Sequence, residues 1–315
     1  MKLLAFLGII VFLIGSFFWL LKLERNSIFE ASFVQIQPNL ASSVNNSTSS
    51  FLLDQNNKLS DLKVKFIPSD ILYQGEAFRI ELENFGEEVP AVIYFRDKEY
   101  PVFFYNNKPT AVIPLAVDEK TGTAEIRVGE KEFFVSVLPG IFHVEEIAPP
   151  KPLPPKISAR RLREKNTIDA VYKTVRSEIF FDSPFIFPLD NSFFDTSPFG
   201  VQRLIKNTGQ KISFHNGVDF RAPIGTPVKA VNDGVVALAE NYLFEGGFVI
   251  LDHGFGINSV YLHLSRINVK NGDKVAKGQI IGLSGNSGYS TGPHLHFTIK
   301  INGIAVDPIR FLTLW

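Results

Sequence analysis

The sequence predicts a mainly β protein, with two antiparallel β domains that follow a single N-terminal transmembrane helix. Between residues 62 and 138, apolar and polar side chains alternate with a period of two, as along residues 78–83, which indicates half-buried strands. From residue 186 onward, hairpin turn signals such as Asn-Asp-Gly at 232–234 separate short apolar runs. The 30 phenylalanines, against a single methionine, also favour broad apolar sheet surfaces.

The N-terminal segment is predicted to be a membrane anchor comprising residues 1–25. Residues 3–21 carry no charge, and a run of this length spans the hydrocarbon core of a bilayer. A cleavable signal peptide is the alternative, but its apolar region is usually shorter and is followed by small residues. Here Lys22 and Arg25 follow the apolar run, so an uncleaved anchor is favoured.

The remaining chain divides into four segments by composition. Residues 26–60 are a flexible polar linker, and residues 61–142 are a small β-sandwich of the immunoglobulin-like kind. Residues 143–185 contain a proline-rich linker and an amphipathic helix, expected at 158–179. Residues 186–315 form the second β domain. The role of the sandwich stays open between a spacer, a binding module and a regulatory domain.

Charge and cysteine content exclude several classes of function. Lys and Arg together number 32, as do Asp and Glu, so no net charge points to a nucleic-acid partner. The chain has no cysteine, which excludes disulfides, thiolate metal sites and a cysteine nucleophile. Any metal site must therefore use histidine and carboxylate ligands.

Five of the six histidines lie between His215 and His296, and four of these five fall in three short motifs. In His294-Leu295-His296, residues two apart on a strand face one side, so both imidazoles project together while Leu295 enters the core. His215 and Asp219 are four residues apart, and on an extended strand they also share a face.

The third motif places His263 between Leu262 and Leu264, which are both expected on the core face. Two imidazoles and one carboxylate make a catalytic zinc set, and spare imidazoles can move protons and stabilise an oxyanion. The spacing alone leaves open which imidazoles bind metal, and each motif by itself is often only a polar strand face. Of the other candidates, His253 is interpreted as structural or supporting, and Asp307 as a turn or cap residue.

Several ordered motifs in this region resemble a known family. They are SPFG at 197–200, HNGVDFRAPIGTPVKAV around His215, LDHGFGINSVYLHLS around His263, the segment ending in GPHLHF at 297, and the closing VDPIRFL. From about residue 187 to 312 the chain resembles the lysostaphin-type, LytM-like zinc endopeptidases of bacterial peptidoglycan.

This resemblance implies a barrel-sandwich-like antiparallel fold and a role for each histidine in the motifs. His215, Asp219 and His296 are implied as ligands of Zn²⁺. His263 and His294 are implied as the general base and the transition-state stabiliser, without deciding which is which. All five positions are filled, which argues against a degenerate relative. In the glycine-rich loop before the histidines, substrate contacts and ordinary turn roles are equally open for Ser287, Tyr289, Ser290 and Thr291.

The expected function is that of a zinc-dependent endopeptidase that hydrolyses peptide cross-links of peptidoglycan during wall remodelling. It is expected at the cell membrane as a single-pass protein whose catalytic domain faces the periplasm or the extracellular wall. The main alternative is a non-catalytic wall-binding adaptor that regulates another hydrolase. A lipoyl- or biotinyl-type carrier is disfavoured, because the hairpin tip at 232–234 lacks the lysine that a carrier modifies.

Overall fold

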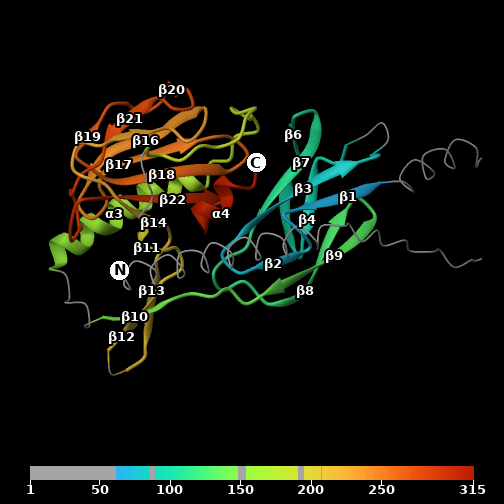
Figure 1. Ribbon diagram of the computed structural model, residues 1–315, viewed down its shortest axis with the longest axis horizontal. Coiled ribbons are helices and arrows are strands. Elements are labelled where there is room, and N and C mark those ends of the chain that lie inside the picture. Colours follow the sequence, from blue (N-terminus) through green and yellow to red (C-terminus); the bar gives the residue numbers. More distant parts are fainter. Residues whose placement is uncertain (1–61, 86–88, 148–153, 191–194, 207) are drawn as a thin grey trace, which may run out of the picture. The chain divides into compact units, whose positions relative to one another are not determined.

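The computed structural model describes residues 62–85, 89–147, 154–190, 195–206 and 208–315 (Figure 1). Strands dominate these residues, as the sequence predicts. None of the helices within these ranges has both the length and the apolar character that a membrane span requires. The predicted anchor at 1–25 and the linker at 26–60 lie outside the described residues.

Residues 62–138 form two sheets that enclose one hydrophobic core. The first sheet, in spatial order, consists of β1 (Lys63–Ile67), β3 (Ala77–Glu83), β7 (Lys108–Pro114) and β6 (Phe103–Tyr105). The second consists of β2 (Ile71–Tyr73), β9 (Lys131–Leu138), β8 (Gly122–Val128), β4 (Val92–Phe95) and β5 (Lys98–Pro101). The arrangement is a β-sandwich.

Strand β3 departs from the simple alternation expected of residues 78–83. Phe78 and Ile80 enter the sandwich core as expected, but Arg79 and Glu81 on the opposite face are also buried. Arg79 pairs with Glu81 at 3.0 Å, and its guanidinium carbon lies 5.1 Å from the centre of the Trp315 ring. The C-terminal residue thus covers a strand face that the alternating pattern alone assigns to solvent.

The described residues from 144 onward, the C-terminal part, contain three sheets (Figure 1), and the largest carries Asp219, His263, His294 and His296. Its spatial order is β11 (Asp195–Ser197), β14 (Val218–Arg221), β22 (His294–Ile301), β18 (Ile257–Leu264), β17 (Gly246–Asp252), β16 (Gly234–Tyr242) and β20 (Lys274–Val275), and β23 (Ile304–Val306) pairs with β22. A second sheet consists of β15 (Pro227–Lys229), β21 (Ile280–Leu283) and β19 (Arg266–Ile267), and a third of β10 (Val144–Ile147), β12 (Gln202–Ile205) and β13 (Lys211–Phe214).

Strand β22 has the regular alternation that its sequence predicts. Leu295, Phe297 and Ile299 are fully buried in the main core of the C-terminal part. The intervening side chains therefore project from the opposite face of the large sheet. This regularity brings His294 and His296 to one side of the sheet.

The predicted amphipathic helix is present as α3, but with different bounds and a narrower apolar face. It begins at Pro155 rather than at residue 158, because proline is tolerated in the first turn of a helix. It ends at Tyr172 rather than at residue 179. Ile168 is buried against side chains of β16, β17 and β18. Leu162 within α3 and Val175 beyond its end, two apolar residues of the expected helix, are 59% and 49% exposed.

Two residues to which the sequence assigns structural roles have them. Asp307 caps the short helix α4 (Pro308–Leu312), and its side chain accepts hydrogen bonds from the backbone N–H groups of Ile309 and Arg310. His253 is fully buried, with Nδ1 2.6 Å from the Asp233 carbonyl oxygen and Nε2 2.8 Å from Ser259 Oγ. Burial lowers the pKa of His253 to about 4.

The buried His253 predicts that the protein loses stability in mild acid. Its pKa is about 4 in the folded state and about 6.5 when unfolded. Between these values the unfolded chain binds more protons, so this residue destabilises the fold as pH falls from 6.5 towards 4. From pH 7 to pH 5 its contribution falls by about 2 kcal/mol.

Urea unfolding of the wild type and of His253→Asn at both pH values measures this contribution. The variant should be less stable at pH 7, yet its stability should change less between pH 7 and pH 5 than that of the wild type. An identical pH dependence in the two proteins would show that His253 is not responsible.

Candidate metal centre

Two of the candidate ligands face each other across neighbouring strands. Asp219 on β14 is the direct cross-strand partner of His296 on β22. Val218 and Phe220, on either side of Asp219, enter the main core, as Leu295 and Phe297 do beside His296. Both polar side chains therefore project from the sheet face that lies opposite the core.

His215 reaches the same place from outside the large sheet, and not along one strand with Asp219 as the sequence spacing suggested. Strand β13 ends at Phe214 and β14 begins at Val218, so residues 215–217 form the connection between two sheets. The His215 N–H donates to the Val201 carbonyl oxygen at 2.9 Å, which ties this connection to the neighbouring chain.

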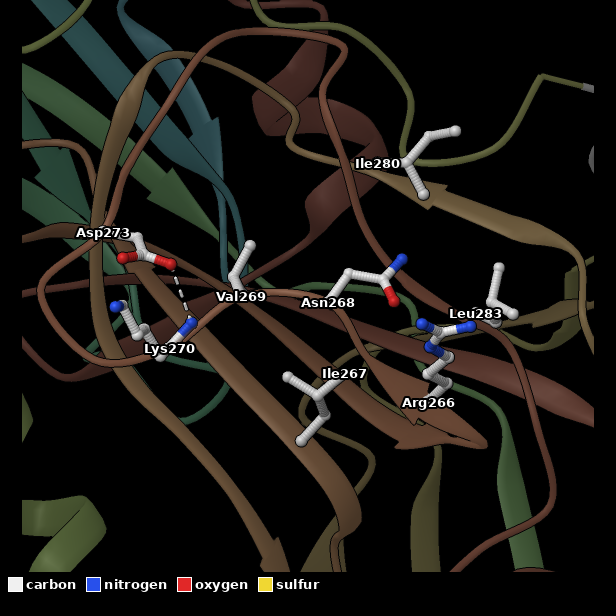
Figure 2. A pocket seen from close by; sticks show the side chains of 8 residues that line it. All are labelled: Arg266, Ile267, Asn268, Val269, Lys270, Asp273, Ile280 and Leu283. Atoms are coloured by element: carbon white, nitrogen blue, oxygen red, sulfur yellow. Dashed lines mark hydrogen bonds between the residues drawn. The ribbon is translucent and has the colours of Figure 1, made fainter.

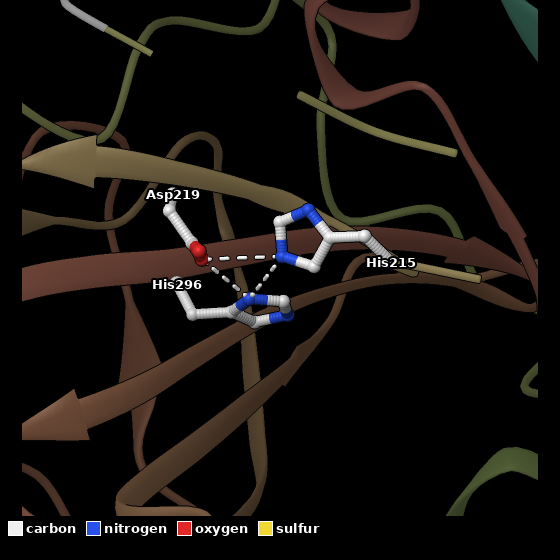
Figure 3. Close-up of side chains that lie close together, drawn as sticks. All are labelled: His215, Asp219 and His296. Atoms are coloured by element: carbon white, nitrogen blue, oxygen red, sulfur yellow. Dashed lines mark hydrogen bonds and ion pairs between the residues drawn. The ribbon is translucent and has the colours of Figure 1, made fainter. Parts of the chain in front are cut away.

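The three side chains form a compact triangle of possible ligand atoms (Figure 3). His215 Nε2 lies 3.2 Å from Asp219 Oδ1 and 3.1 Å from His296 Nδ1, and the last two atoms are 2.8 Å apart. In a tetrahedral zinc site with bonds of 2.0–2.1 Å, ligand atoms are separated by about 3.3 Å. The triangle therefore has nearly the dimensions of three zinc ligands.

The protonation of these groups also fits a cation. His215 Nδ1 lies 2.8 Å from the Pro198 carbonyl oxygen, which can only accept, so Nδ1 carries the proton and Nε2 keeps a lone pair. His296 Nε2 lies 3.0 Å from Thr298 Oγ1, which leaves Nδ1 free to present a lone pair when Nε2 donates. Two lone pairs and a carboxylate thus converge, a donor set that suits Zn²⁺.

The carboxylate remains ionised in this half-buried position. Burial alone would raise the pKa of Asp219, but hydrogen bonds and charge from His215 and His296 hold that pKa far below its usual value. Burial would also lower the pKa of His215, an effect that the adjacent Asp219 outweighs, whereas burial prevails at His296 and lowers its pKa. Asp219 accordingly remains a carboxylate that can bind a cation.

His263 completes the histidine group from an irregular position on β18. Its backbone φ is +62°, and the β17–β18 register shifts between the pairs Gly247–Leu264 and Val249–Tyr261, which marks a bulge. The bulge breaks the alternation, so Leu262 and Leu264 do not share one core face. Leu264 enters the main core, whereas Leu262 packs with the cluster under α3.

Backbone carbonyl groups orient the rings of His263 and His294. His263 Nδ1 lies 2.8 Å from the Ser287 carbonyl oxygen, and His294 Nδ1 lies 2.8 Å from the Gly292 carbonyl oxygen. Because a carbonyl only accepts, each Nδ1 carries a proton and each neutral ring keeps a lone pair on Nε2. The ring centres are 4.7 Å apart, and His294 Nε2 lies 3.6 Å from Asp219 Oδ1.

Burial lowers the pKa of His263 to about 4, with a further effect of the neighbouring imidazoles. The ring is therefore neutral at pH 7 and able to accept a proton. The sequence reasoning did not identify the carbonyl groups of Pro198, Ser287 and Gly292, since backbone groups leave no signal in residue type. Thr298 was also missed, although it follows His296 at a spacing of two on the same strand face.

The candidate substrate residues of the glycine-rich loop differ from one another in exposure and in hydrogen bonding. Ser287 Oγ accepts from the Gly247 N–H at 2.9 Å and donates to the Leu264 carbonyl oxygen at 2.7 Å, so this hydroxyl anchors the loop. Ser290 Oγ lies 3.2 Å from His294 Nδ1. Tyr289 is 80% exposed with its ring beside Phe244, and Thr291 is exposed.

A separate open groove of about 820 Å³ lies along β19, the following loop and β21 (Figure 2). Arg266 and Lys270 line it together with apolar side chains such as Ile280, and the Lys270 N–H donates to Asp273 at 3.0 Å. None of the residues that line this groove belongs to the histidine group.

Comparison with known proteins confirms the resemblance that the sequence motifs carry. Residues 213–308 match the family described as Peptidase family M23. The chain is 44% identical over 124 residues to the peptidoglycan DD-endopeptidase ShyA of Vibrio cholerae, an alignment that covers 39% of this chain and 29% of that protein. It is 48% identical over 104 residues to the glycyl-glycine endopeptidase ALE-1 of Staphylococcus capitis, covering 31% of this chain and 29% of the relative.

A longer similarity extends beyond the family match. A crystal structure from Pseudomonas aeruginosa, described as a candidate M23 peptidase, aligns with 77% of this chain and 96% of its own chain, at a TM-score of 0.55 and 28% identity. The two curated relatives, in contrast, are each matched over less than a third of their length. The mainly β fold of the C-terminal part is thus that of M23 peptidases.

The close approach of Gly217 to β22 predicts that a methyl group there weakens metal binding. A Cβ at this position would lie 2.4 Å from the Phe297 carbonyl oxygen and 2.8 Å from His296 Nε2. Gly217→Ala should displace His296 and reduce zinc affinity about 10- to 100-fold, the usual cost of disturbing a group that supports a ligand. Competition with a zinc chelator measures the affinity.

Gly292→Ala is the matched control, because a Cβ there meets nothing within 4 Å and the backbone needs no positive φ. This variant should bind zinc as the wild type does. Equal zinc affinity in Gly217→Ala and the wild type would contradict the proposed position of the metal.

Proposed function

Because the chain carries a domain of peptidase family M23 at residues 213–308, we propose that it is a zinc-dependent endopeptidase acting on the peptide cross-links of bacterial peptidoglycan. The proposed role is wall remodelling. The relatives named peptidoglycan DD-endopeptidase and glycyl-glycine endopeptidase support this substrate class.

The observation that carries the proposal is the convergence of five side chains, four from the large sheet and His215 from the connection before β14. The triangle of His215, Asp219 and His296 has the size and donor types of a zinc site. Beside it, hydrogen bonds at Nδ1 orient the rings of His263 and His294 and leave Nε2 of each ring available for proton exchange. A metal site with two adjacent proton carriers suits amide hydrolysis.

Each residue has a distinct proposed part in the reaction. Zinc held by His215, Asp219 and His296 would supply a Lewis acid that activates water and polarises the scissile carbonyl group. Of His263 and His294, one accepts a proton through Nε2 while the other, once protonated, donates a hydrogen bond to the developing oxyanion. The carbonyl groups of Ser287 and Gly292 keep both rings oriented, so neither must reorganise during the reaction.

We also propose that the catalytic domain works outside the cytoplasmic membrane and that residues 1–25 anchor it there. The reason for the location is the substrate, which surrounds the cell, and the reason for the anchor is the uncharged run at residues 3–21. Protease added to intact spheroplasts should then digest the C-terminal domain. Digestion only after the spheroplasts are lysed would overturn this placement.

Substitutions at the five positions should separate metal binding from turnover. His296→Ala should lose both bound zinc and activity, because it removes a ligand. His263→Ala and His294→Ala should keep zinc but lose about 10²- to 10⁴-fold in turnover, the usual contribution of a positioned acid or base. Zinc analysis and digestion of purified peptidoglycan, with mass spectrometry of the released fragments, measure both quantities.

Walls of two defined chemistries, with glycine bridges and with direct D-Ala–diaminopimelate links, identify the bond that is cut. Loss of zinc in His263→Ala and His294→Ala alone would reverse the assigned roles. Wild-type protein that binds purified peptidoglycan without digesting it would favour the adaptor function instead. Digestion that survives His296→Ala at the wild-type rate would contradict the zinc-dependent mechanism.

A further inference from the structure

We propose that helix α3 is a positioning element for catalysis, which acts through Glu164 and Arg161 on the turn between β16 and β17 and thereby on His263. The inference rests on the proposed hydrolase function. It concerns a segment outside the residues 213–308 that match the M23 family.

The first contact is a hydrogen bond from the turn to the helix. Glu164 Oε2 accepts from the backbone N–H of Leu243 at 3.2 Å, while its other oxygen accepts from Arg160 Nε at 2.7 Å. The Glu164 side chain is only 11% exposed, so it is held between these two partners. A carboxylate that accepts from a backbone N–H forms a charge-assisted hydrogen bond, which is stronger than a neutral one.

The second contact is a stack of side chains beside the first. The guanidinium carbon of Arg161 lies 4.4 Å from the centre of the Phe244 ring, a cation–π distance. The Phe244 ring in turn lies 6.0 Å from that of Tyr289, and the Phe244 carbonyl oxygen accepts from the Tyr289 N–H at 2.8 Å. The helix therefore supports both the turn and the glycine-rich loop.

The turn and the loop both hold His263. The Glu245 carbonyl oxygen accepts from the His263 N–H at 2.9 Å, and the Ser287 carbonyl oxygen accepts from its Nδ1 at 2.8 Å. The two segments pack closely because Gly246 and Gly288 lack side chains: a Cβ on Gly246 would lie 2.3 Å from Ser287 Oγ, and one on Gly288 2.5 Å from the Phe244 carbonyl oxygen.

His263 needs this support because its backbone is in an unfavourable region. A non-glycine residue at φ +62° persists only where the surroundings fix it. The helix itself is anchored further along, where Ile168 is buried and Lys300 Nζ lies 4.2 Å from the centre of the Tyr172 ring. A helix fixed at its C-terminal half thus presents Glu164 and Arg161 to the turn.

Glu164→Ala in the full-length protein tests the proposal. Loss of this hydrogen bond should lower kcat about five- to tenfold, with KM and zinc content unchanged. Hydrogen exchange, read by mass spectrometry, should rise in the peptides that cover residues 241–247 and 260–266. Glu164→Gln keeps an oxygen acceptor and should restore most of the activity and protection.

Lys165→Ala is the matched control, since Lys165 pairs with Asp169 on the exposed surface of the same helix. It should leave kcat and exchange at the wild-type values. Wild-type kcat and exchange in Glu164→Ala, or equal losses in Lys165→Ala, would overturn the proposal. If the wild type does not digest peptidoglycan, the proposed function fails, while the exchange data still decide whether α3 holds the turn and His263.

Discussion

The antiparallel register between β14 and β22 is the constraint on which the candidate metal centre depends. It makes Asp219 and His296 direct cross-strand partners, while their neighbours Phe220 and Leu295 enter the core. A slip of one residue would turn the ligands towards the core and the apolar side chains towards the open face. The same apolar burial that stabilises the sheet therefore also specifies the position of the ligands.

The remaining parts of the site come from segments that are not regular strands. His215 lies in a connection between sheets, and His263 occupies a bulge with a positive φ. Backbone carbonyl groups fix these rings and that of His294, which is the usual way in which outer groups orient metal ligands and catalytic imidazoles. The helix α3, which lies outside the family match, also helps to position a catalytic imidazole, because it supports the turn whose Glu245 carbonyl group holds His263. Its Ile168 packs against β16, β17 and β18, whereas Glu164 and Arg161 contact the turn between β16 and β17.

The sequence predicts the mainly β fold and names the five side chains that the structure brings together, but part of the reasoning behind these predictions is wrong. Alternation along β22 is regular, so the common side of His294 and His296 follows directly from spacing. The spacing of His215 and Asp219 suggested one strand, and the two residues meet for a different reason, since a connection between sheets separates them. Leu262 and Leu264 separate because a bulge is set by tertiary contacts that a local pattern does not encode.

The other differences between the predicted and the observed structure also have physical causes. Arg79 and Glu81 have a polar pattern typical of an exposed face, yet both are buried, and Trp315, far along the chain, lies against Arg79. The helix α3 begins within the proline-rich stretch because proline lacks a donor that the first turn does not need. The motif-based resemblance assigns His296 rather than His294 as a ligand, whereas spacing leaves the two equivalent. In the structure His296 Nδ1 lies 2.8 Å from Asp219 Oδ1, whereas His294 Nε2 lies 3.6 Å away.

X-ray absorption at the zinc edge on the purified protein tests the central claim most directly, because it reports the atoms bound to the metal. The account predicts one zinc per chain, bound by two imidazole nitrogens and one carboxylate oxygen at about 2.0–2.2 Å, with water in the open position. A folded, active protein without zinc, or a zinc bound by three or more imidazoles and no carboxylate, would contradict it.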